Sequence, residues 1–101
     1  MINKLSTSEA VEILLADEYA GWTYEGATAL VEWLEDLEGE MGIPIELDPI
    51  ALRGQFDEYR DVEEAAEDYH IHPFFDSLEW LSERGVVIEF KTGLIVGEFS
   101  I

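Results

Sequence analysis

The chain has no cysteine and only five Lys or Arg residues among 101. The lack of cysteine excludes disulfides and thiolate chemistry, and it fits the reducing cytoplasm. The scarcity of basic residues argues against direct binding to nucleic acids or anionic membranes, because both attract positive charge. No apolar run approaches the ~18 residues of a membrane span, and the N-terminus lacks a secretory-signal pattern. We therefore expect a cytoplasmic protein.

Sequence features of catalysis are also lacking. There is no Gly-rich phosphate loop, no dinucleotide fingerprint and no GxSxG motif. His70 and His72 lie close together but have no obvious third metal ligand, so loop histidines are the simpler interpretation. The segment Asp57–Asp61 lacks the alternating ligands and the central Gly of a calcium loop. These absences predict a protein that is not an enzyme and that needs no cofactor or metal ion.

Acidic residues, in contrast, are present in large excess. The 24 Asp and Glu residues give a formal net charge of −19. Solubility of a small domain needs a net charge of only roughly 2–8, and a larger charge makes the folded state repel itself. The 48% of hydrophobic residues distinguish the chain from a disordered acidic tail. We predict a single domain over residues 1–101, with a surface suited to a basic partner.

The clearest predicted element is a helix from Thr23 to Met41. Thr23 is a natural N-cap, and Gly42 followed by Pro44 ends the helix. Apolar residues recur with helical spacing and predict a buried face formed by Ala27, Leu30, Val31, Leu34, Leu37 and Met41. Trp33 lies on the flank of this face, where it belongs either to the core or to an interface.

A first helix is predicted upstream of it. Ser6 and Glu9 have the spacing of a capping box, and Gly21 is the predicted end. Its predicted buried stripe consists of Val11, Leu14, Leu15 and Tyr19.

The middle of the chain predicts a strand and a short helix. Ile50–Phe56 follows an interrupting Pro49 and alternates in the manner of a strand. Residues 57–60 are predicted to be a charged connection. Asp61, with Glu64 three residues later, caps a third helix that continues to about residue 69.

The C-terminal third predicts a helix and a hairpin. Asp76 with Glu79, and Phe75 with Trp80, have the spacing of a capping box and a hydrophobic staple, and this helix ends before Gly85. Residues 86–90 and 94–101, joined by a Lys-Thr-Gly turn, form the predicted hairpin. The order α-α-β-α-α-β-β predicts an α+β fold, with a small, mainly antiparallel sheet of about three strands packed against helices.

The acidic residues concentrate in the second helix and in the segment from residue 46 to residue 68. Carboxylates one helical turn apart are separated by ~5.4 Å along the axis, and phosphates of one DNA strand rise ~3.4 Å each. Surface acids usually alternate with Lys and Arg, and here those pairing partners are missing. The predicted phosphate-mimicking residues are Glu25, Glu32, Glu35, Asp36, Asp57, Glu58, Asp61, Glu63, Glu64, Glu67 and Asp68.

The segments TYEGATALVEWLEDLE and IELDPIALRGQFDEYRDVEEAAEDY, within residues 20–69, resemble small acidic proteins encoded by bacteriophages and other mobile elements. Such proteins include anti-CRISPR and anti-restriction proteins that mimic DNA and occupy the DNA-binding surface of a host defence complex. The resemblance implies that role, with a CRISPR-Cas effector or a restriction enzyme of the host bacterial cytoplasm as the target.

We therefore predict a non-catalytic inhibitor whose acids pair with Lys and Arg of a DNA-binding surface. Two alternatives stay open. One is an immunity protein or antitoxin that neutralises a basic toxin through aromatic anchors such as Trp33 or Tyr59. The other is an acidic phage structural or assembly protein. A monomer and a homodimer both fit the sequence, since an open strand edge or Trp33 would support self-association.

Overall fold

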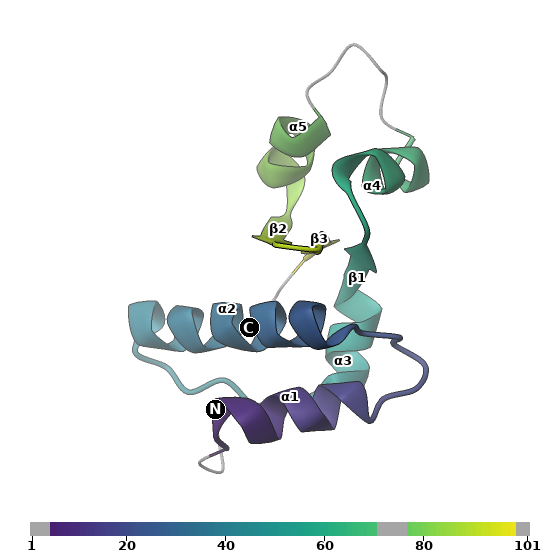
Figure 1. Cartoon of the computed structure of the whole chain (residues 1–101). Coiled ribbons are helices and arrows are strands. Elements are labelled where there is room, and N and C mark those ends of the chain that lie inside the picture. Colours follow the sequence, from purple (N-terminus) through teal and green to yellow (C-terminus); the bar gives the residue numbers. More distant parts are fainter. Residues whose placement is uncertain (1–4, 71–76, 99–101) are drawn as a thin grey trace.

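A three-stranded antiparallel sheet separates two layers of helices in the computed structural model (Figure 1). The structure describes residues 5–70 and 77–98. The elements are α1 (Thr7–Leu15), α2 (Tyr24–Met41), α3 (Pro49–Gln55), β1 (Phe56–Tyr59), α4 (Val62–Asp68), α5 (Ser77–Arg84), β2 (Val86–Phe90) and β3 (Gly93–Gly97). Helices α1 and α2 lie on one face of the sheet, and α4 and α5 lie on the other (Figure 1). The predicted α+β class is confirmed.

Strand β3 lies at the centre of the sheet, which has the order β1-β3-β2. Its residues Leu94, Ile95 and Val96 are all buried. Because successive side chains of a strand point to opposite faces, Ile95 packs toward α1 and α2, and its two neighbours pack toward α4 and α5. One short central strand therefore contributes to two hydrophobic clusters, one on each face of the sheet. The predicted hairpin is confirmed by β2 and β3, with Phe90 paired to Gly93 across the turn. Strand β3 begins at Gly93, which was expected in the turn, and ends at Gly97, while residues 99–101 of the predicted return strand lie outside the described residues.

Helix α2 has the predicted bounds and cap, but the predicted buried face is fully buried only as far as Leu34, and Leu37 is half-buried. The Thr23 hydroxyl accepts a hydrogen bond from the Gly26 amide, and Gly42 ends the helix with a left-handed backbone (φ 67°). Ala27, Leu30, Val31 and Leu34 are buried, whereas Met41 at the end of the helix is exposed. No helix in the described residues is long and apolar enough to cross a membrane.

Helix α1 ends at Leu15, earlier than the predicted Gly21. The Asp17 carboxylate accepts a hydrogen bond from the Tyr19 amide, and this turn takes the chain out of the helix. As a result, two residues of the predicted buried stripe are on the surface: Leu15 is exposed, and Tyr19 is 89% exposed. The capping box of Ser6 and Glu9 is present as predicted.

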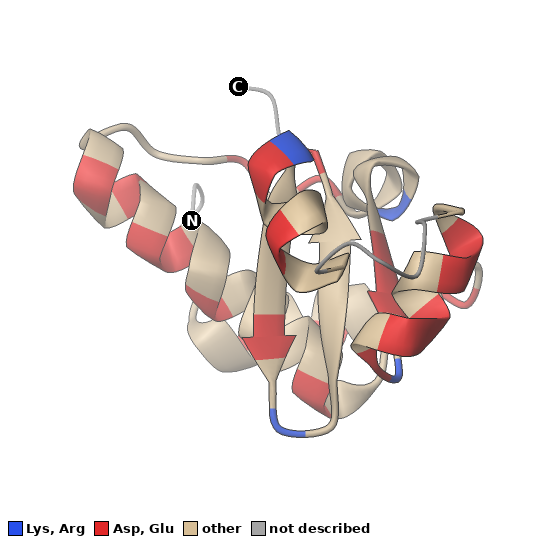
Figure 2. Cartoon of the chain, turned by 90° about the horizontal axis from the view of Figure 1, so that it is seen from above, with Lys and Arg blue, Asp and Glu red and all other residues tan. Residues whose placement is uncertain are grey.

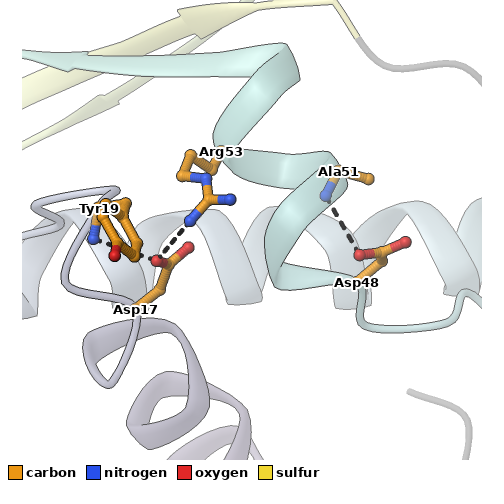
Figure 3. Close-up of polar contacts among 5 residues, drawn as sticks. All are labelled: Asp17, Tyr19, Asp48, Ala51 and Arg53. Carbon is orange, nitrogen blue, oxygen red and sulfur yellow. Dashed lines mark hydrogen bonds and ion pairs between the residues drawn. The ribbon is translucent and has the colours of Figure 1, made fainter.

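The predicted strand Ile50–Phe56 is wrong, because this segment forms helix α3 (Figure 3). The Asp48 side chain accepts a hydrogen bond from the Ala51 amide at 3.1 Å and caps the helix. Pro49 stands in the first helical turn, where its missing amide hydrogen costs no hydrogen bond. The proline taken as an interruption of a strand therefore begins a helix.

Strand β1 occupies the segment predicted to be a charged connection. Phe56 and Tyr59 are buried on opposite faces of the sheet. Between them in the sequence are Asp57, which is exposed, and Glu58, which is half-buried. The strand pairs with β3, with Phe56 opposite Gly97. Two apolar residues three positions apart fit a short strand that is covered by helices on both faces.

Helix α3 is held against the turn after α1 by an ion pair. Arg53 Nη1 lies 2.9 Å from Asp17 Oδ1, and the guanidinium also lies over the Tyr19 ring, 5.3 Å from its centroid (Figure 3). Arg53, one of the few basic residues, therefore has a structural role.

Helix α4 begins at the predicted cap, since the Asp61 side chain accepts a hydrogen bond from the Glu64 amide. Helix α5 ends at Arg84, before Gly85, also as predicted. The proposed capping and staple residues Asp76 and Phe75 lie outside the described residues.

Candidate partner-binding surface

No Asp or Glu residue in the described part of the chain is fully buried, although one carboxylate oxygen of Asp17 is enclosed. The eleven predicted phosphate-mimicking acids nevertheless fall into two groups. Five of them accept hydrogen bonds or form ion pairs inside the fold, namely Glu35, Glu58, Asp61, Glu64 and Asp68. The structure therefore narrows the set that is available to a partner.

Glu58 is the most strongly engaged of these acids. Its carboxylate accepts hydrogen bonds from the Thr23 amide at 3.0 Å and from the Thr23 hydroxyl at 2.6 Å. The negative charge thus lies at the N-terminus of α2, where it interacts favourably with the helix dipole. Gly26 makes room for it, because a Cβ at that position would lie 2.1 Å from Glu58 Oε1.

Glu35, Asp61 and Glu64 also have structural roles. Glu35 lies on α2, and its two carboxylate oxygens share a hydrogen bond donated by the Thr7 hydroxyl of α1, at 2.8 and 3.0 Å. Asp61 caps α4, and Glu64 approaches Arg60 at 3.3 Å. An exposed ion pair such as that of Glu64 with Arg60 contributes little stability, at most about 1 kcal/mol.

Asp57 and Asp68 form an acidic pair beside two tyrosines. The Tyr59 hydroxyl donates a 2.5 Å hydrogen bond to Asp68. The pKa of Tyr59 is raised, mainly by burial and next by this hydrogen bond, so its phenol keeps its proton and remains a hydrogen-bond donor. Partial loss of water, together with the charge of Asp68, raises the pKa of the Asp57 carboxyl. Tyr69 packs edge-on against Tyr59, with ring centroids 6.3 Å apart.

The other six predicted acids are exposed, and none of them has a hydrogen bond or ion pair within the described part of the chain. They are Glu25, Glu32 and Asp36 on α2, Asp57 on β1, and Glu63 and Glu67 on α4. Figure 2 shows acidic positions along both α2 and α4, with few basic positions between them. These six residues are the best candidates for partner contacts.

Three surface hollows connect the acids of α2 with those of α4. The first lies between α2 and β2, and Glu25, Glu32 and Asp36 line it. The second, at the start of α2, contains Glu25 together with Glu58. The third contains Glu58 together with residues of β1 and α4, namely Asp57, Tyr59, Glu64, Glu67 and Asp68. Since Glu25 and Glu58 are each shared by two hollows, the acidic lining is continuous.

Two basic residues interrupt this surface. Lys91 lines the first hollow and Arg60 the second. Arg60 is already paired with Asp61 and Glu64, at 3.8 and 3.3 Å. The surface therefore keeps a strong excess of negative charge.

The predicted set missed Glu89 and the apolar residues next to it. Glu89, Ile88 and Phe90 of β2 line the same hollow as the α2 acids. The alternation of residues 86–90 marks a strand, but nothing in the sequence indicates that this strand lies over α2. That arrangement depends on the pairing of segments far apart in the chain.

The expected anchor Tyr59 is buried, with 8% exposure, so that only a small part of it lines the hollows and is available to a partner. Trp33 is half-buried and stacks edge-on against Phe56, with centroids 6.0 Å apart. His70 is exposed with a positive φ of 55°, while His72 lies outside the described residues. Within residues 5–70 and 77–98, no three potential ligands converge on a metal site.

No protein-family model, curated protein or solved structure matches this chain. Its function is therefore inferred from the surface itself.

Proposed function

We propose that the protein is a non-catalytic inhibitor that mimics DNA and occupies the DNA-binding surface of a host defence complex. A CRISPR-Cas effector or a restriction enzyme is the proposed target. The observation that carries the proposal is the continuous acidic surface from α2 to α4. Five exposed acids that line it have no counter-ion in the described residues, namely Glu25, Glu32, Asp36, Asp57 and Glu67. Lys and Arg side chains of the target would supply the missing counter-ions.

The charge density supports this proposal. The molecule extends 45 Å along its longest axis and has a net charge of −19. This corresponds to roughly one negative charge per 2.4 Å, and duplex DNA carries one per ~1.7 Å. A target that binds DNA through phosphate contacts would therefore meet a strongly negative field on this protein, and association would be fast at low salt.

The test compares two charge-reversal variants with equal net charge. The first changes Glu25, Glu32 and Asp36 to Lys. The control changes three exposed acids that line none of these hollows, which are Glu18, Glu46 and Glu83. Each protein is added to purified restriction enzymes and CRISPR effector complexes, and DNA binding by these complexes is measured at several salt concentrations.

We expect the unmodified protein and the control variant to displace DNA from at least one complex, with a steep loss of affinity as salt rises. The α2 variant should lose at least tenfold in affinity, since about 1.4 kcal/mol is a factor of ten and three ion pairs are reversed. Equal inhibition by both variants, or inhibition that does not depend on salt, would reject DNA mimicry.

One observation favours the alternative of a toxin-neutralising protein. Tyr24 is 66% exposed and lines the hollow between α2 and β2, beside the α2 acids. An exposed aromatic residue in this position would suit a specific protein partner. This alternative predicts one cognate basic partner that has no DNA-binding activity to inhibit. Capture of such a partner by the unmodified protein, with no displacement of DNA from any defence complex, would favour it.

A further inference from the structure

The outer edge of β2 is open in the described part of the chain. The sheet order is β1-β3-β2, and β2 pairs with β3 but with no other described strand. An open edge presents backbone N–H and C=O groups to any extended segment that approaches it. Addition of a strand to such an edge is a common way for proteins to bind peptides.

The register identifies which backbone groups are available. The Glu98 amide, just after β3, donates to the Gln55 carbonyl, just before β1, at 3.1 Å. Backbone groups alternate in direction along a strand, so even-numbered residues of β3 face β1 and odd-numbered ones face β2. The residues opposite those odd-numbered positions are Val86, Ile88 and Phe90. The backbone groups of Val87 and Glu89 therefore point outward at the open edge.

The hollow between α2 and β2 lies beside the second half of this edge, from Ile88 onward, and forms a groove with an apolar floor and an acidic rim. Its volume is about 430 Å³, which accommodates a few side chains. The floor includes Ala29, Trp33, Ile88 and Phe90. The rim includes Glu25, Glu32, Asp36 and Glu89, with Lys91 as its one basic residue.

We propose that this groove binds an extended, arginine-rich segment of a partner protein, which adds to β2 as a fourth strand. The backbone groups of Val87 and Glu89 would pair with the added strand. Every second side chain of that strand would lie over α2, where a guanidinium stacks on the rings of the groove and pairs with its carboxylates.

Charge decides between this occupant and a second copy of the chain. Two copies would bring equal negative charges together, which is unfavourable. The inference rests on the proposed function for its basic partner, but the docking mode itself depends on the open edge of β2.

The probe is a nine-residue synthetic peptide of alternating Arg and Thr with neutral ends. On binding, it should slow hydrogen exchange of the Val87 and Glu89 amides, which make no hydrogen bond within the described sheet. The matched peptide has the same sequence and charge but carries N-methyl groups on every second amide. We expect it to bind at least tenfold more weakly, which corresponds to the loss of one or two hydrogen bonds.

A second comparison uses protein variants. Glu89→Pro removes the outward amide and the charge, whereas Glu89→Gln removes the charge alone. Proline is tolerated at an edge position whose amide makes no hydrogen bond within the sheet, and circular dichroism checks that both variants fold. We expect Glu89→Pro to bind the peptide about tenfold more weakly than Glu89→Gln.

Equal affinities within both pairs, unchanged exchange at Val87 and Glu89, or self-association through β2 in sedimentation would overturn the inference. The two proposals also fail separately. Displacement of DNA by a protein that does not bind the peptide at β2 would reject this docking mode alone. Binding of the peptide at β2 without effect on any DNA-binding complex would reject the proposed target and keep the docking mode.

Discussion

At the residue scale, carboxylates that lie side by side have different roles. Glu25 and Glu58 line the same hollow. Glu58 accepts two hydrogen bonds from Thr23, whereas Glu25 accepts none within the described residues. A carboxylate that binds the N-terminus of a helix stabilises the fold, so loss of Glu58 would mainly affect stability, and loss of Glu25 would mainly affect binding.

Asp57→Asn should stabilise the protein at neutral pH. The pKa of Asp57 is raised by partial burial and by Asp68. A group whose pKa is raised on folding binds its proton more tightly in the folded state, so its ionisation lowers stability above the ordinary value of 3.8. The gain should be below about 1 kcal/mol, because solvent screens a partly exposed charge.

Urea unfolding at neutral pH and near pH 4 measures this effect. The difference between Asp57→Asn and the unmodified protein should shrink as the pH falls through the pKa of Asp57. The control is Glu63→Gln, at an exposed α4 position without a hydrogen bond in the described residues. An equal gain for this control would show that total charge, and not the Asp57–Asp68 pair, is responsible.

At the element scale, the sequence predicts well those elements whose signals are local. Helix α2 has both caps and a complete apolar stripe, and the β2–β3 hairpin has alternation and a tight turn. In residues 48–59, however, Asp48-Pro49 fits either a helix start or an interrupted strand, so α3 and β1 were assigned wrongly. The secondary structure of residues 48–59 is decided by the contact of α3 with the Asp17 turn and by the pairing of β1 with β3. Both partners lie far away in the sequence.

The candidate surface was predictable to a similar extent. The acids of α2 and α4 stand out by the scarcity of Lys and Arg nearby, and six of the eleven are exposed without internal partners in the described residues. The sequence does not show that Glu35 binds Thr7, or that Glu89 lies beside α2. Each of these contacts joins segments separated by at least 28 residues.

The two interior glycines of α2 provide a test of the contact between Glu58 and that helix. A Cβ at Gly39 would meet nothing within 4 Å, whereas one at Gly26 would displace the Glu58 carboxylate. Gly39→Ala should therefore stabilise the protein by about 0.5–1 kcal/mol. Gly26→Ala should be less favourable than this by about 1–2 kcal/mol, because hydrogen bonds to Glu58 are lost.

A double-mutant cycle separates the two effects, with free energies of unfolding measured in urea. In a Glu58→Ala background, Gly26→Ala should become stabilising to about the same extent as Gly39→Ala. If Gly26→Ala stays unfavourable there, backbone packing and not the Glu58 carboxylate is the reason for this glycine.

At the scale of the whole molecule, the net charge of −19 gives stability and partner binding opposite dependences on salt. Self-repulsion lowers the stability of the free protein, and added salt screens it, since the Debye length falls from ~30 Å at 0.01 M to ~10 Å at 0.1 M. The same screening weakens attraction to a basic partner. A surface selected for binding would therefore lower the stability of the protein that carries it.

Thermal unfolding tests this relation. Raising NaCl from about 0.01 M to about 0.3 M should raise Tm by several degrees, since ~1 kcal/mol corresponds to about 4–8 °C in a domain of this size. A variant with Glu25, Glu32 and Asp36 changed to Gln should have a higher Tm at low salt and a smaller response to NaCl. Sucrose at equal osmolality controls for effects other than screening. A Tm that does not depend on NaCl would mean that the acids are too far apart to repel one another, and the comparison of this surface with DNA would then fail on physical grounds.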